Sequence, residues 1–317
     1  MWYVARRVTY LVPTWLGITL LAFVVGQFAP GDPASAFFTR HHGRPPSTAE
    51  LQRTRHELGL DEPAASRYVH SVGDALHGDL GVSYTSGRPV ADELTKRFPA
   101  TFELAVAATL LAVLVGLPLG VLAALRRNSL LDQLTRGGSL LAASVPSFWL
   151  AYLLIIVFSV QLRLLPSFGS GGIEHLILPA IALALGEAGF VTRLARSSLL
   201  DVLGEDYITT ARAKGLPERR VIGVHALKNA SGVVVTQIGL LFGYLLAYSV
   251  IVEVIFVWPG IGRLAIEAIT QRDYPVIQGF VIFTGTVFIL VNLTVDLVYQ
   301  RLDPRISLSS APRPAVS

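Results

Sequence analysis

The chain has 317 residues, of which 52% are hydrophobic and 15% are charged, and its formal net charge is +4. This composition is that of an integral membrane protein and excludes an ordinary soluble domain. The basic residues cluster at the ends of apolar runs, which argues against a nucleic-acid-binding surface. Cysteine is absent, so disulfides and cysteine-ligated metals are excluded.

Several apolar runs are each close to the ~20 residues that a helix needs to cross a bilayer. They lie at about 8–29, 101–125, 138–160, 175–194, 231–257 and 276–299. We predict helices for all of them, because a helix satisfies its own backbone hydrogen bonds in lipid. The first run is too long for a usual signal peptide and lacks a small-x-small cleavage site, so we expect a retained span. The predicted fold class is all-α, a polytopic bundle of six transmembrane spans.

Basic residues in the short loops are distributed unequally between the two sides of this bundle. One side holds Arg6, Arg7, Arg126, Arg127, Arg136, Arg193, Arg196, Arg212, Lys214, Arg219, Arg220, Lys228, Arg301 and Arg305, and the other holds Arg163, Arg263 and Arg272. The positive-inside rule therefore predicts that both termini and the loop at 205–230 are cytoplasmic.

Residues 30–100 form the one sizeable segment that is too polar to span. Ser47 and Glu50 have the spacing of a capping box, which predicts a short helix that ends near Gly59. Pro63 is suited to open a second helix. That helix would carry Tyr68, Val69, Val72 and Leu76 on one side. We predict a small extracytoplasmic helical insertion between the first and second spans.

The polar, basic stretch at 205–230 separates the fourth apolar run from the fifth. Residues 206–214 favour a short helix with Arg212 in its last turn, and Gly215 follows where a C′ glycine belongs. Pro217 is suited to open a second short helix. The pattern predicts a helix–glycine–helix elbow, a rigid knob for contact with a soluble partner. The alternative is a basic loop that only fixes topology or contacts anionic lipid.

This elbow resembles the cytoplasmic EAA loop of ABC-importer permeases. The general pattern is Glu-Ala-Ala, three residues, Gly, nine residues and Ile-x-Leu-Pro. With Gly215 as its glycine, residues 209–211 and 225–228 match it only in part. The dipeptide/oligopeptide branch reads Tyr-Ile-x-Thr-Ala-Arg-Ala-Lys-Gly-Leu and later His-x-Leu-x-Asn. Residues 207–216 and 225–229 are similar to that branch throughout.

Four further stretches resemble the same peptide-importer permeases. They are Pro30-Gly31-Asp32-Pro33, the Gly78-Asp79-Leu80-Gly81-x-Ser83-Tyr84 motif, the run from Glu253 to Gly262 with Trp258-Pro259-Gly260, and Leu302-Asp303-Pro304-Arg305-Ile306. The resemblance covers nearly the whole chain except about the last ten residues. We expect the tail at 301–317 to lack fixed structure.

The resemblance implies a permease subunit of a binding-protein-dependent importer in the cell inner membrane, with residues 101–300 as the five-span permease core after a first span at 1–29. It implies a second homologous permease, two cytoplasmic ATP-binding subunits, an extracytoplasmic substrate-binding protein and membrane lipid as partners. Its implied cargo is a di- or oligopeptide, although related permeases import nickel or other small solutes. Contact with the ATPases would fall on Thr210, Ala211, Arg212, Ala213, Lys214, Gly215 and Leu216.

No catalytic pattern is found in the sequence. The chain has no Gly-x-x-x-x-Gly-Lys-Ser/Thr phosphate loop, no His-Glu-x-x-His and no Gly-x-Ser-x-Gly. We therefore predict that the chain is not an enzyme, holds no cofactor or metal, and depends on separate subunits for ATP hydrolysis. Most of the histidines, His41, His42, His56, His70 and His77, lie in the 30–100 segment, with His41 and His42 in a predicted loop. Their spacing matches no metal-ligand pattern.

Two carboxylates fall within predicted spans, where an ionisable group is costly. Glu187 in the fourth span and Glu253 in the fifth are candidates for a translocation path. The alternative for each is a buried hydrogen bond to another helix. An ion-coupled secondary transporter, with either carboxylate as coupling site, is the rival from a different class. The spans show no inverted repeat, which argues against it.

Glycines recur at small-xxx-small spacing in two of the predicted spans. Gly116 and Gly120 lie in the second span, and Gly239 and Gly243 in the fifth. Such spacing lets helix backbones approach closely. It predicts close helix packing, either within this subunit or with a second permease.

Overall fold

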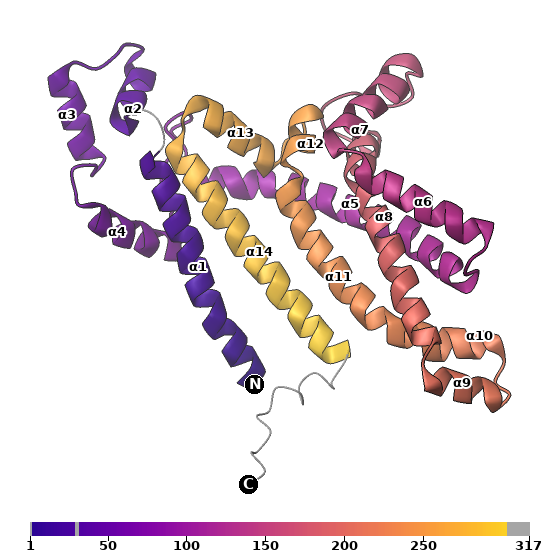
Figure 1. Cartoon of the computed structure of the whole chain (residues 1–317). Coiled ribbons are helices and arrows are strands. Elements are labelled where there is room, and N and C mark those ends of the chain that lie inside the picture. The colour runs from indigo at the N-terminus through magenta and orange to yellow at the C-terminus, as the bar shows by residue number, and fades with distance from the viewer. Residues whose placement is uncertain (1, 29–31, 303–317) are drawn as a thin grey trace, which may run out of the picture. The chain divides into compact units, whose positions relative to one another are not determined.

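The structure is a computed structural model that describes residues 2–28 and 32–302. Pro30 and Gly31 of the first peptide-importer motif and the tail from residue 303 onward lie outside the described residues. The chain divides into two compact units, Met1–Thr101 with Pro259–Ile289 and Phe102–Trp258 with Leu290–Ser317, which we call unit 1 and unit 2. Apart from one isolated bridge between Val82 and Pro89, the described residues form helices and loops (Figure 1). The all-α fold class is confirmed.

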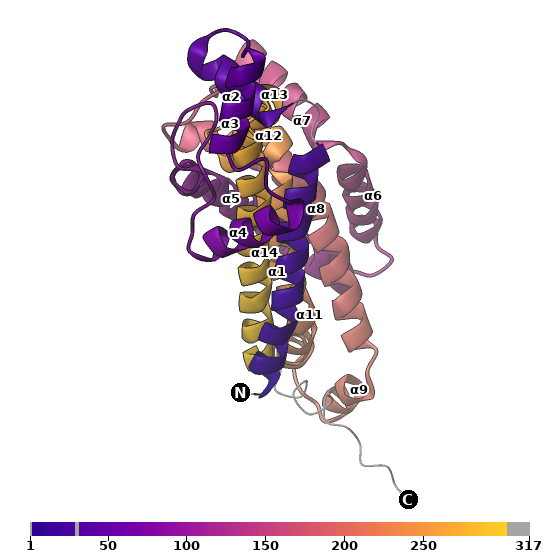
Figure 2. The same ribbon diagram turned by 90° about the vertical axis from the view of Figure 1, so that its left-hand side faces the viewer.

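Unit 1 is built around two long helices that run side by side, as Figure 2 shows. Its elements are α1 (Trp2–Phe28), α2 (Pro33–His42), α3 (Thr48–Glu57), α4 (Ala64–Leu76), the start of α5 (Val90–Leu125), α13 (Ile261–Gln271) and most of α14 (Tyr274–Leu302). Trp15 on α1 donates its Nε1–H to Thr286 Oγ1 on α14 at 3.0 Å. Gly285 lets the two backbones approach, because a Cβ there would lie 2.8 Å from Ile18.

The predicted insertion contains three helices rather than two. The capping box of Ser47 and Glu50 is formed, which confirms the prediction for α3. The additional helix is α2, which is capped by Asp32 and ends at Gly43 in a left-handed conformation. His41 and His42 therefore lie in the last turn of a helix, and their placement in a loop was wrong.

The helix α4 lies across α1 (Figure 2). The Tyr68 hydroxyl donates to the Leu16 carbonyl at 3.1 Å, and its ring meets Phe23 edge-on at 5.5 Å. Val69 and Leu76 are 66% and 69% exposed. The predicted stripe is therefore only partly buried, because α4 contacts α1 mainly through Tyr68.

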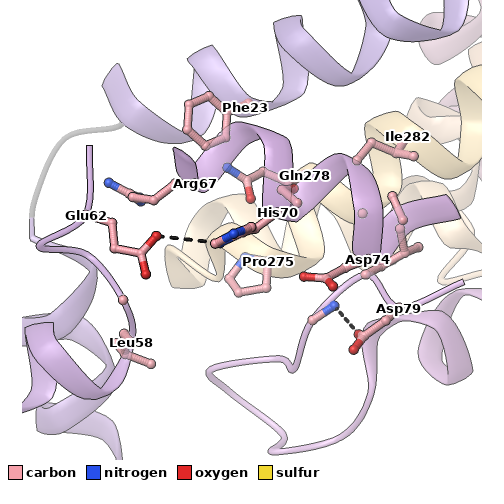
Figure 3. Close-up of a pocket in the computed structure, with 16 residues that line it drawn as sticks. Phe23, Leu58, Glu62, Arg67, His70, Asp74, Asp79, Pro275, Gln278 and Ile282 are labelled. Atoms are coloured by element: carbon pink, nitrogen blue, oxygen red, sulfur yellow. Dashed lines mark hydrogen bonds and ion pairs between the residues drawn. The ribbon is translucent and has the colours of Figure 1, made fainter. Parts of the chain in front are cut away.

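Unit 1 contains a cavity of about 310 Å³ (Figure 3). It is lined by residues of α1, α4 and α14 and by the start of the Gly78–Tyr84 motif. His70 pairs with Glu62 there at 3.5 Å, and Asp79 accepts a hydrogen bond from the Gly81 amide at 2.8 Å. Both contacts join residues that lie close together in the sequence.

Unit 2 carries the remaining spans. Its elements are the rest of α5, α6 (Leu130–Ser144), α7 (Ser147–Leu154), the π-helix η1 (Ile155–Gln161), α8 (Ile173–Leu203), α9 (Asp206–Ala213), α10 (Glu218–Arg220), the π-helix η2 (Val221–Ala226), α11 (Leu227–Tyr248), α12 (Val250–Ile255) and the end of α14. The glycines of α5 allow close contact with α8. A Cβ on Gly116 would lie 2.6 Å from the Ala188 carbonyl oxygen, and one on Gly120 would lie 2.5 Å from that of Thr192. The predicted glycine packing is confirmed here within this chain.

The third predicted span is not one straight helix. The helix breaks after Ser144 and resumes at Ser147, and the two parts meet at 95°. Pro146 cannot donate a backbone hydrogen bond, and Val145 before it is extended with ψ 119°. Within residues 2–28 and 32–302, five helices are long and apolar enough to cross a membrane, or up to six when this bent pair counts as one span.

Further boundaries differ from the prediction. The helix of the second span begins at Val90 rather than near residue 101, and the helix of the fourth span continues to Leu203 rather than ending near residue 194. The helix of the fifth span begins at Glu218 rather than near residue 231 and continues to Tyr248. The segment before the sixth span contains a separate helix, α13, where a loop was expected.

Candidate functional site

The elbow at 205–230 is a hairpin formed by α9 and the start of the fifth-span helix (Figure 1). Gly215 has φ +77°, a left-handed conformation that disfavours residues with a Cβ. The Gly215 amide donates to the Arg212 carbonyl at 2.9 Å, and the Leu216 amide donates to the Ala211 carbonyl at 3.3 Å. These two bonds define a Schellman cap, which confirms the predicted helix–glycine turn.

The inner face of α9 is apolar and buried. Ile208 and Ala211 are 0% and 7% exposed. They pack in one cluster with Ala124 of α5, Leu199 of α8, and Val221, Ala226 and Ala230 of the fifth-span helix. Leu216 packs against the same cluster from the turn. Side chains from the ends of three helices therefore hold α9 in place.

The outer face of the elbow is polar. Arg212 Nη2 donates to Glu218 Oε1 at 2.8 Å, and Nε donates to Oε2 at 3.3 Å, so a two-point ion pair closes the turn across Gly215. This ion pair raises the pKa of the Arg212 guanidinium. The side chain of Lys214 is exposed and forms no hydrogen bond or ion pair with the described residues.

The structure divides the predicted coupling residues between two faces. Ala211 and Leu216 belong to the inner cluster. The exposed members are Thr210, Arg212, Ala213, Lys214 and Gly215. A partner that approaches the elbow would therefore meet a polar face on which Lys214, like Arg219 and Arg220, is exposed and has no side-chain ion pair among the described residues.

The sequence predicted a separate short helix as the second arm of the elbow, and this prediction was wrong. From Glu218 the chain passes through the π-helix η2 into α11 without a break. Asn229 donates its Nδ2–H to the His225 carbonyl at 2.6 Å, one turn back along this helix. The second arm of the elbow and the fifth span are therefore parts of one continuous helix.

The two candidate path residues have different surroundings in unit 2. Glu187 on α8 is half-buried, and its carboxylate forms no hydrogen bond or ion pair within the described part of the chain, so it is joined neither to Glu253 nor to the elbow. Glu253 on α12 is fully buried and accepts a hydrogen bond from Ser249 Oγ at 2.8 Å. The hydrogen bond from Ser249 favours a packing role for Glu253 over a place in the translocation path.

Sequence reasoning missed a buried carboxylate in unit 1. Asp273, 2% exposed, precedes α14 and accepts hydrogen bonds from the Ser83 hydroxyl at 2.6 Å and from the amides of Tyr84 and Thr85, both at 3.0 Å. Burial, together with the nearby Asp273 carboxylate, raises the pKa of Tyr84 to about 12. Asp-Tyr-Pro before an apolar run signals a helix start. This local pattern does not indicate that Asp273 pairs with Ser83, 190 residues away.

No group of three or more histidine, cysteine, aspartate or glutamate side chains is arranged to hold a metal ion in the residues that the structure describes. The histidines of the insertion instead make local contacts. His41 and His42 stack on Phe37 and Phe38, one turn back in α2.

Fold and site together define a multi-pass helical membrane protein with a capped polar hairpin between two spans. Residues 116–308 match the family described as "Binding-protein-dependent transport system inner membrane component". Residues 1–105 match its N-terminal companion, "Binding-prot-dependent transport system membrane comp, N-term". The chain belongs to this family.

Curated relatives agree with that assignment over almost the full length. The dipeptide transport system permease protein DppB of Escherichia coli K12 is 43% identical, and the alignment covers 96% of this chain and 98% of that protein. The glutathione transport system permease protein GsiC of the same strain is 42% identical with the same coverage. The chain is therefore the permease subunit of an ABC importer, a multi-pass protein of the inner membrane, and the resemblance found in the sequence is confirmed.

Solved structures support the same fold at lower identity. An inward-facing structure of the MetNI methionine ABC transporter matches with a TM-score of 0.55 and 19% identity, over 66% of this chain and 96% of the other. A second crystal form gives a TM-score of 0.56. The match concerns the fold alone.

Proposed function

We propose that this permease carries di- or oligopeptides. The proposal is supported by the cargo in the names of its relatives, which are a dipeptide permease and a permease for glutathione, itself a small peptide. The peptide-importer motifs in this sequence support it too. The first test is uptake of a labelled dipeptide by cells that express the complete importer. Nickel uptake without dipeptide uptake would refute it.

The proposed assembly places this chain beside a second homologous permease, with the translocation path between them. Two ATP-binding subunits on the cytoplasmic side would hydrolyse ATP, because this sequence has no phosphate loop. A substrate-binding protein would deliver the peptide from outside. The excess of basic residues in the loops supports cytoplasmic termini and a cytoplasmic elbow.

In the proposed mechanism, the elbow couples the ATPases to the path. The observation that carries this role is the shape of the elbow, a helix with a Schellman cap joined to a helix that continues from Glu218 to Tyr248. The apolar cluster of the inner face attaches α9 to α8 and α11, so the hairpin moves as one body with the ends of both spans. ATP-driven closure of the ATPases would tilt these spans and switch access between the two sides.

Co-purification tests the docking step. Membranes co-expressing this chain, the partner permease and the ATPases are solubilised, and the amount of retained ATPase is measured for Lys214→Glu. We expect a marked loss, since Lys214 is exposed and free to pair with a partner. Arg127→Glu, an equal charge change on an exposed residue outside the elbow, is the matched control. If Lys214→Glu retains as much ATPase as Arg127→Glu, the proposal that the elbow docks the ATPase is refuted.

Arg212 requires a different design, because its charge also closes the turn. Arg212→Glu alone breaks the ion pair with Glu218, whereas the double variant Arg212→Glu with Glu218→Arg restores the pair in reverse. If Arg212 acts only by closing the turn, the double variant recovers ATPase retention. If the ATPase itself contacts the guanidinium, retention stays low in both variants.

A further inference from the structure

The outer ends of two unit 1 helices enclose a second cavity, of about 450 Å³. Its walls are the first turns of α5 and the start of α13. The volume is within the range of small-molecule sites, about 300–1,000 Å³. Almost every lining side chain is charged, which distinguishes it from the apolar surfaces that face lipid.

The positive charges in this cavity outnumber the negative ones. Arg88, Lys96, Arg97 and Arg263 line it together with Glu93 and Glu267. Four cations against two carboxylates leave an excess of two positive charges. A cavity with such an excess attracts and holds anions.

Both carboxylates are already shared among the arginines. Glu93, whose side chain is 11% exposed, pairs with Arg97 at 3.5 Å and with Arg88 at 3.9 Å. Glu267 pairs with Arg263 at 2.8 Å and with Arg97 at 3.3 Å. The excess charge therefore has no counter-charge left within the cavity wall.

Among the cations that line the cavity, Lys96 is the one whose side chain has no partner. This side chain is exposed and makes no hydrogen bond or ion pair with any described residue. The ion-paired arginines beside it are held in place, and guanidinium groups in fixed positions bind carboxylates with directional hydrogen bonds. One free ammonium next to fixed guanidinium groups has the charge and the hydrogen-bond donors that a carboxylate requires.

We propose that this cavity binds the terminal carboxylate of the cargo peptide as the peptide enters the permease. The inference rests on the proposed peptide cargo and on the proposed orientation, which places the start of α5 and α13 at the outer face. Every unmodified peptide carries one terminal carboxylate whatever its sequence. A site for that group alone would accept peptides of many sequences.

The test uses the absence of cysteine from the natural chain. Ala100 lines the cavity, so Ala100→Cys places the only thiol of this subunit beside the charges. The assembled importer in nanodiscs is labelled with an anionic and with a cationic methanethiosulfonate reagent. We expect the anionic reagent to be favoured by about 10-fold relative to the free thiol, as the local potential predicts.

Ligand protection identifies the group that is bound. Dialanine should slow labelling at Ala100→Cys, and dialanine amide, which has no carboxylate, should not. Adding Lys96→Gln should remove the protection, whereas Arg53→Gln, an exposed cation on α3, should leave it unchanged. Equal protection by both peptides, or protection that survives Lys96→Gln, would overturn the proposal.

Two results separate this inference from the cargo proposal. If the importer takes up dipeptide but dialanine gives no protection, the cargo stands and the carboxylate site is wrong. If dipeptide uptake is absent while the anionic reagent is still favoured, the cavity attracts anions and the cargo proposal fails. Lys96 is exposed and unpaired, so Lys96→Gln should leave folding intact.

Discussion

Two turns of the molecule, at Gly215 in unit 2 and at Asp273 in unit 1, are held by opposite means. The Gly215 turn depends on neighbours in sequence, namely two backbone bonds from residues 215 and 216 to carbonyls of α9. The Asp273 turn depends on groups about 190 residues away, which donate three hydrogen bonds to one carboxylate. A locally closed turn can move as a body with its helices, whereas the buried carboxylate fixes two distant segments together. The first arrangement suits a coupling element and the second a fixed frame.

The largest expected effect follows from removing the distant bonds. Asp273→Ala leaves the Ser83 hydroxyl and the Tyr84 and Thr85 amides without their acceptor, which should destabilise unit 1 by about 3 kcal/mol or more. We expect a lower thermal unfolding midpoint in detergent and faster protease cleavage in the 83–89 loop. Asp79→Asn is the matched control, since that exposed carboxylate accepts only from the nearby Gly81 amide. Cleavage rates equal to wild type in Asp273→Ala would show that the frame is held by other contacts.

An intermediate effect is expected at the local turn, where the conformation is the sensitive property. Nothing lies within 4 Å of a Cβ built on Gly215, so there is space for a larger side chain. What restricts substitution is the φ of +77°. Gly215→Ala should cost about 1 kcal/mol, and Gly215→Asn less, because Asn enters the left-handed region more readily. Gly215→Pro cannot adopt this φ and also loses the bond to the Arg212 carbonyl.

Peptide uptake and the amount of subunit in the membrane, measured side by side, check this series. Uptake should fall in the order glycine, asparagine, alanine, proline, with none left in the proline variant, while membrane insertion stays the same. Normal uptake by a stably inserted Gly215→Pro variant would contradict the coupling role of the elbow.

The same contrast explains what could be predicted from the sequence. The α3 capping box and the cap at Gly215 were predicted correctly because each motif lies within about six residues. The bend at Pro146 was missed because the apolar run continues across it and outweighed the proline. The early start of the fifth-span helix was missed because Arg219 and Arg220 are polar, although backbone hydrogen bonding continues regardless of polarity. The buried hydrogen bonds of Asp273 could not have been predicted, since no local sequence pattern indicates partners about 190 residues away.

The smallest effect is expected at a second local motif, the capping box of α3, and it depends on pH. Hydrogen bonds from Arg44 and then from Ser47 hold the pKa of Glu50 far below its ordinary value of 4.5. A lowered folded-state pKa means that the contribution of Glu50 to stability is complete above pH 4.5 and is lost as the pH falls from there toward the folded-state pKa.

Hydrogen exchange of the α3 amides should therefore be faster at pH 3 than at pH 6, after correction for the intrinsic rate. Glu50→Gln, which has no carboxylate to titrate, should exchange faster than wild type at both pH values and lose this pH dependence. Because the box is exposed and local, the change should stay within α3, and loss of protection throughout unit 1 would show that the insertion depends on this helix cap.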